Sequence, residues 1–135
     1  MKKILTLFCI ALPLGAVIDL FWIGVVSINF YREQLGSLFA PTIVWQAALL
    51  FYVFYILAII GFAVLPALKA HSLKRALLLG AGLGFTAYMT YDLTNLAVIR
   101  DWPLLMSVVD IAWGTFFTTL ISGITYVIAT KFFRL

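Results

Sequence analysis

Apolar residues fill four long runs of the chain, and short stretches between them carry most of the charged side chains. The runs cover residues 4–28, 41–68, 76–99 and 103–130. Each is long enough to cross about 30 Å of hydrocarbon at 1.5 Å rise per residue. Small and polar residues recur within them at helical spacing, without the alternation typical of membrane β-strands. The pattern predicts an all-α fold, an up-down bundle of four transmembrane helices in a single domain, 1–135.

The composition supports a membrane protein. Of the 135 residues, 65% are hydrophobic and 10% are charged, far from the balance of a water-soluble domain. The net charge of +4 does not indicate nucleic-acid binding, because the basic residues lie at segment ends and form no stripe. The first apolar run follows Lys2 and Lys3 but is too long for a signal peptide, so we expect a retained helix.

The basic residues also predict an orientation. The side with both termini holds seven of them and the other side two, which by the positive-inside rule places both termini in the cytoplasm. The seven are Lys2, Lys3, Lys69, Lys74, Arg75, Lys131 and Arg134, and the two are Arg32 and Arg100.

Three of the apolar runs contain an aspartate. Asp19 lies about 10 residues before the outer end of its run, Asp92 about 8 before Arg100, and Asp110 about 7 after Pro103. These depths agree within about one helical turn, so we expect the three carboxyls to converge in the outer half of the membrane. Ionisable residues are costly in hydrocarbon and are therefore candidates for a functional site, with structural hydrogen bonding as the alternative.

Small and polar residues place each aspartate on an interior helix face. Small residues mark close helix contacts in membranes, and we expect Gly84 at such a contact. The three faces are Ala11, Gly15, Asp19 and Trp22; Gly80, Gly84, Tyr88, Asp92 and Asn95; and Ser107, Asp110, Gly114, Thr118, Ser122 and Tyr126.

No Lys or Arg lies at the depth of the aspartates. Three ionised carboxylates without a counter-charge are unfavourable there, so either some are protonated or a cation binds among them. Oxygen ligands favour H⁺, Na⁺, Mg²⁺ or Ca²⁺. The runs contain no His, and Cys9 is the only cysteine, so we expect no zinc, copper or haem, no dedicated metal site and no cofactor.

The candidate binding residues combine the acids with aromatic and amide side chains that can hold a carboxylate or a ligand. The set is Asp19, Trp22, Gln46, Tyr52, Tyr88, Asp92, Asn95, Asp110 and Trp113.

Several short motifs contain or flank these residues. They are Asp19-Leu20-Phe21-Trp22, Phe30-Tyr31-Arg32 with Leu35-Gly36, Phe51-Tyr52, residues 62–68, residues 91–97 and residues 109–114. Over nearly the whole chain they resemble a bacterial membrane-protein family, domain of unknown function 2177. The resemblance implies a small four-helix protein of the bacterial inner membrane. It supports Asp19, Trp22, Asp92, Asn95, Asp110 and Trp113 as a pattern but supplies no activity.

Three classes of function fit these features. We favour binding or transport of a cation or small polar solute from the periplasmic side, with proton exchange on the carboxyls. Four helices leave little room for alternating access, so transport would need a homodimer. The second class is an intramembrane enzyme that uses carboxyl acid–base chemistry on a lipid or isoprenoid. The third is an accessory subunit whose polar layer binds a partner helix.

Overall fold

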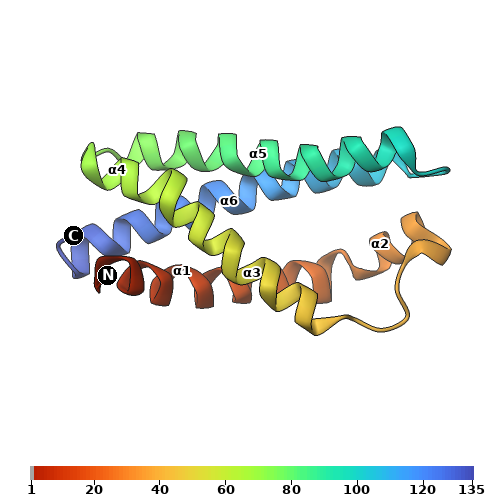
Figure 1. The fold of residues 1–135 in the computed structure, drawn as a ribbon, viewed down its shortest axis with the longest axis horizontal. Helices are drawn as coiled ribbons and strands as arrows, with labels where there is room; N and C mark the ends of the chain where they lie inside the picture. The colour runs from red at the N-terminus through yellow and green to blue at the C-terminus, as the bar shows by residue number, and fades with distance from the viewer. Residues whose placement is uncertain (1) are drawn as a thin grey trace.

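The computed structural model describes residues 2–135 as helices joined by short connections (Figure 1). In chain order the elements are α1 (Lys2–Phe21), the π-helix η1 (Trp22–Val26), α2 (Ile28–Leu35), the 3-10 helix η2 (Gly36–Leu38), α3 (Trp45–Ile59), the π-helix η3 (Ile60–Val64), α4 (Leu65–Lys69), α5 (Leu73–Val98) and α6 (Leu104–Phe132). Residues 2–135 contain no β-strand, so the all-α prediction is confirmed.

Three helical segments are long and apolar enough to cross a membrane: Lys2–Val26, Trp45–Lys69 and Leu104–Phe132. Many large apolar side chains on their outer faces are exposed, as expected for helices that face lipid. The fourth long helix, α5, has 26 residues but is less apolar. The structure thus supports three of the four predicted spans, and the four-helix bundle stays a prediction.

The helices run roughly along one direction, apart from α3, which crosses the molecule obliquely (Figure 1). Helices α5 and α6 form a long antiparallel hairpin and share the most extensive contact between helices. Both termini lie at one end, together with the turn between α4 and α5. The opposite end holds α2 and the turn between α5 and α6. The molecule therefore has two distinct ends along its helix axes.

Some helix boundaries differ from the predicted ones. The second apolar helix begins at Trp45 rather than at Pro41, because residues 41–44 are not helical and Val44 has ψ of 85°. Residues 29–40, which lie between the first two predicted runs, contain most of α2. An apolar pair four residues apart, Tyr31 and Leu35, explains this short helix, since both pack inward on the bundle.

Trp102 lies in the turn between α5 and α6, and only 8% of it is exposed. Asp101 adopts a left-handed conformation (φ 59°) in the turn before α6, and Trp102 packs against the bundle. Its indole Nε1–H donates to the Ser107 hydroxyl at 3.0 Å. Trp102 therefore anchors the turn between α5 and α6 to the interior of the bundle.

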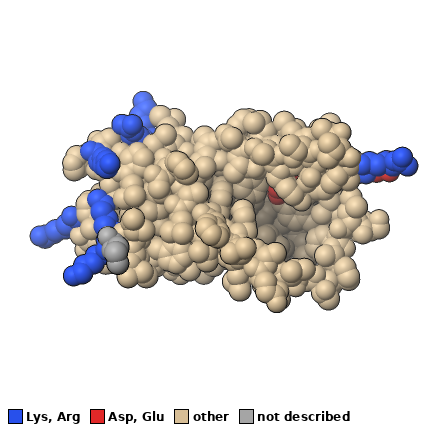
Figure 2. All heavy atoms as spheres, viewed as in Figure 1, with Lys and Arg blue, Asp and Glu red and all other residues tan. Residues whose placement is uncertain are grey.

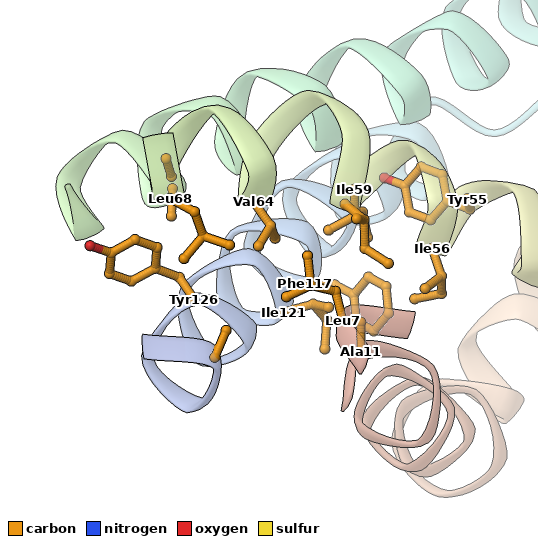
Figure 3. Packing of buried hydrophobic residues seen from close by; sticks show 14 residues of the cluster. Leu7, Ala11, Tyr55, Ile56, Ile59, Val64, Leu68, Phe117, Ile121 and Tyr126 are labelled. Atoms are coloured by element: carbon orange, nitrogen blue, oxygen red, sulfur yellow. The ribbon is translucent and has the colours of Figure 1, made fainter. Parts of the chain in front are cut away.

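The main apolar core lies in the half of the molecule that carries the termini (Figure 3). Leu7 and Ala11 of α1 meet Ile59 and Val64 of the second apolar helix and Ile121 of α6, all of them fully buried. Close packing of this kind leaves little free volume.

Glycines let α5 and α6 approach each other closely, as predicted for Gly84. A Cβ atom at Gly84 would overlap the Gly114 carbonyl oxygen and would lie 2.7 Å from Thr118 Cβ. At Gly80 the same atom would lie 2.6 Å from the Ser122 hydroxyl. Small residues at such positions are the usual means by which membrane helices come into contact.

We expect Gly84→Ala to lower the free energy of unfolding by about 1–3 kcal/mol, because the added methyl group must displace the backbone of α6. The matched control is Gly82→Ala on the same helix, where a Cβ has no neighbour within 4 Å and should be neutral or slightly stabilising. Unfolding of both variants in detergent, followed by circular dichroism, tests this. Equal stability of the two variants would contradict the close contact.

Candidate functional site

A cavity of about 550 Å³ lies between α1, α2, α3, α5 and α6, in the half of the molecule away from the termini. Figure 2 shows a hollow in this half of the molecule, with a small red patch of Asp or Glu atoms in its wall. Aromatic and aliphatic residues form most of the lining, which consists of Asp19, Trp22, Ile23, Tyr31, Leu35, Phe39, Ala48, Phe51, Tyr52, Tyr55, Ala87, Tyr88, Tyr91, Met106, Asp110 and Trp113. A mostly apolar wall with a few polar groups is typical of small-molecule sites.

Asp19 is held by donors from two other helices. The Tyr52 hydroxyl on α3 donates to Asp19 Oδ2 at 2.5 Å, and the Trp113 indole on α6 donates to Oδ1 at 3.1 Å. Only 7% of Asp19 is exposed. Because each carboxyl oxygen has its own donor, the orientation of the group is fixed by α1, α3 and α6 together.

Asp110 is held in a similar way from α2. The Tyr31 hydroxyl donates to Asp110 Oδ1 at 2.6 Å and accepts a hydrogen bond from the Trp22 indole at 3.3 Å. Burial, together with the bond to Asp110, raises the pKa of the Tyr31 phenol above its ordinary value. The phenol therefore stays protonated and acts as the donor in this pair.

The two carboxylates are linked through a pair of stacked indoles. Trp22 and Trp113 lie with ring centroids 4.2 Å apart and planes 7° from parallel. Each tryptophan follows an aspartate of its own helical segment by three residues but contacts the aspartate of the other segment. Trp113 donates a hydrogen bond to Asp19, and Trp22 donates to Tyr31, which in turn donates to Asp110. Trp22 begins the π-helix η1, and π-turns inside α-helices often occur at functional sites.

Asp92 lies behind this network rather than in the cavity wall. It is fully buried in the contact between α5 and α6, next to Asp110 and Ser107. Its carboxyl oxygens lie near the Asp110 carboxyl and the Ser107 hydroxyl but form no hydrogen bond of ordinary geometry within residues 2–135. A buried carboxyl beside a second acid is costly.

Tyr55 and Tyr88 form the inner end of the cavity, with their rings edge to face at 6.2 Å. The Tyr55 hydroxyl hydrogen-bonds Thr118 Oγ1 at 2.7 Å. Gly114 makes room for the other ring, because a Cβ at that position would overlap Tyr88. Tyr55 also belongs to the apolar core, so the cavity ends where the core begins.

The structure brings together six of the nine candidate binding residues as lining of one cavity: Asp19, Trp22, Tyr52, Tyr88, Asp110 and Trp113. Asp92 adjoins Asp110 from behind, and Asn95 is half-buried outside the lining. Gln46 is exposed, because it lies in the first turn of α3, beyond the packed part of that helix.

The three aspartates lie in the same region but do not form one three-carboxyl cluster that could hold a metal ion. Asp92 and Asp110 are neighbours, and Asp19 and Asp110 line the same cavity. Within residues 2–135 no three acidic, His or Cys side chains are close enough together to hold a metal ion. Whether all three carboxyls couple directly therefore stays a prediction.

Tyr31 is the main site residue that the pattern of the long helices could not reveal. It lies in α2, between two of the predicted runs, and its contact with Asp110 joins residues 79 positions apart. Phe51, Tyr55 and Tyr91 also line the cavity outside the candidate set. The one signal for Tyr31 was its place in the Phe30-Tyr31-Arg32 motif.

The fold and the cavity define a helical membrane protein with an acidic, aromatic-lined cavity among its helices. The family described as "Predicted membrane protein (DUF2177)" matches residues 4–127, so the chain belongs to this family of unknown function. Comparisons with curated proteins and with solved structures found no match.

We expect Tyr31→Phe to destabilise the protein by about 1–3 kcal/mol, because it removes a hydrogen bond to a carboxylate that ties α2 to α6. It should also weaken the near-ultraviolet circular dichroism of the Trp22–Trp113 stack, since Trp22 loses its acceptor. Tyr126→Phe is the control, because the Tyr126 hydroxyl has no hydrogen bond within residues 2–135 and lies outside the cavity. Stability and spectrum like those of the control would contradict the assigned role.

Proposed function

We propose that the protein is a membrane-embedded binding protein whose cavity holds a small, partly apolar organic molecule. The observation that carries this proposal is that two carboxylates from different helices, Asp19 and Asp110, line one aromatic cavity. The volume of about 550 Å³ is in the range of known small-molecule sites. The polar group of the ligand would meet the carboxylates, and its apolar part would contact the aromatic wall.

An organic ligand fits this cavity better than a bare metal ion. Hard cations such as Ca²⁺ take six to eight oxygen ligands, and Mg²⁺ takes six. Asp19 and Asp110 already accept hydrogen bonds from tyrosine or indole groups, and most other lining residues are apolar. The dedicated ligand set that such an ion needs is therefore missing from the described lining.

Binding is also favoured over passage through the bundle. Beyond Tyr55 the cavity meets the packed core, in which Ile56, Ile59 and Ile121 are fully buried. Transport would require this core to open, and a closely packed apolar core resists such opening. The same cavity could serve transport only through a second conformation or a partner subunit, such as a second copy in a homodimer.

We further propose that α5 is a fourth transmembrane helix. It runs antiparallel to α6 along the hairpin, so both cross the same layer (Figure 1). Its exposed threonines do not prevent this, because they satisfy their hydroxyls internally: Thr90 donates to the Thr86 carbonyl at 2.6 Å, and Thr94 donates to the Thr90 carbonyl. The result would be a four-helix protein of the bacterial inner membrane.

Lys and Arg side chains gather at the end that carries both termini (Figure 2). By the positive-inside rule this end would face the cytoplasm and the cavity would lie in the periplasmic half. Reporter fusions after Leu135 and between residues 36 and 44 should then score cytoplasmic and periplasmic, respectively. The reverse pattern would overturn the proposed orientation.

To test the cavity itself, Ala48→Trp places a large side chain in the lining. We expect organic molecules that co-purify with the wild-type protein, extracted and analysed by mass spectrometry, to be lost from this variant. Leu50→Trp is the control, because Leu50 lies on the same helix, is 62% exposed and is outside the lining. Identical extracts from wild type and both variants would count against a ligand in this cavity.

A further inference from the structure

We infer that the ligand of this cavity is an organic cation, a protonated amine with an apolar body that enters from the lipid. This inference rests on the proposed binding function and specifies the chemical class of the ligand. Four features of the described residues support it: uncompensated negative charge, an unsatisfied acid nearby, aromatic walls and a sideways opening.

The acidic side chains of the cavity have no basic partner in its wall. The lining contains two carboxyl groups and no Lys, Arg or His, so negative charge on either acid has no protein counter-charge there. The hydrogen-bond donors of the carboxylates are two tyrosines and one tryptophan, all neutral. Neutral donors orient a carboxylate but do not cancel its charge, and charges in an environment of low polarity need a partner. A bound cation would supply that partner.

Asp92 adds to this deficit. It is fully buried beside Asp110, and its oxygens form no hydrogen bond of ordinary geometry within residues 2–135. A positive charge next to Asp110 would reduce the electrostatic cost of a second acid directly behind it. An anionic ligand would raise that cost, and a neutral ligand would leave it unchanged.

The aromatic wall suits a cation with an apolar body. The faces of Trp and Tyr rings attract ammonium groups, and the attraction is stronger when water is excluded. Trp22, Trp113 and Tyr52 lie at the carboxylates, while Phe51 and Leu35 supply apolar surface in the same cavity. A charged head group and a hydrocarbon body can therefore be held at once.

The hollow opens to the side of the molecule. Figure 2 looks across the helix axes, and the hollow is visible in this view rather than from an end. If the helices cross the membrane, this face meets lipid. An amine with an alkyl or aryl body partitions into the bilayer and can reach the opening there, whereas a strongly hydrated inorganic ion cannot.

The test uses the full-length protein in phosphatidylcholine nanodiscs and three probes with the same chain: octylammonium, octanol and octanoate. Binding is followed by intrinsic tryptophan fluorescence, since Trp22 and Trp113 line the cavity. We expect octylammonium to bind at least about tenfold more tightly than octanol, and octanoate to bind more weakly than either, because a charge-assisted contact adds to the shared apolar burial.

Asp19→Asn and Asp110→Asn should each weaken octylammonium binding about tenfold or more while leaving octanol binding within about twofold. Retained octanol binding shows that a variant keeps its cavity, so misfolding is not mistaken for loss of charge recognition. Glu33→Gln is the matched control, because Glu33 is an exposed carboxylate of α2 outside the lining, and it should bind all three probes like the wild type.

The inference would be overturned if the wild type bound octanol or octanoate as tightly as it binds octylammonium. Unchanged octylammonium affinity in both Asn variants would do the same. In either case the proposed binding function stands if Ala48→Trp still blocks the probes. If Ala48→Trp binds all probes like the wild type, the cavity is not the site, and the proposed function fails together with the inference.

Discussion

The buried Asp19 carboxylate is the contact on which the rest of the site depends. One side chain of α1 accepts hydrogen bonds from α3 and α6, so three helices meet at a single carboxyl group. The Trp113 indole that binds it also stacks on Trp22, and Trp22 leads through Tyr31 to Asp110. A substitution at Asp19 should therefore perturb every contact in this series, since each side chain positions the next.

This arrangement divides the molecule into two halves with different physical roles. The half with the termini contains an apolar core that holds α1, α6 and the second apolar helix together. In the other half, hydrogen bonds between side chains join the helices around a cavity. The packed half supplies rigidity, and the other half contains the proposed binding site.

The interior faces of the long helices were predictable from the sequence, but their side-chain partners were not. Helical spacing placed Gly84, Asp19 and Thr118 on buried faces, because polar and small residues face inward when lipid surrounds the bundle. Tyr31 and the cross-pairing of the two tryptophans depend on how η1 and α2 continue from α1 and bring Tyr31 to α6. That geometry is set by tertiary contacts, which helical periodicity does not encode.

The contact between Gly114 and Tyr88 has a consequence for selectivity. Gly114 does not line the cavity, yet its missing side chain lets the Tyr88 ring lie against α6. A chain with alanine at 114 would hold that ring further from α6, toward the space a ligand would occupy. Under the proposed binding function, residue 114 would therefore limit the size of the ligand although it lies outside the lining, and a substitution there would change that limit without altering any binding group.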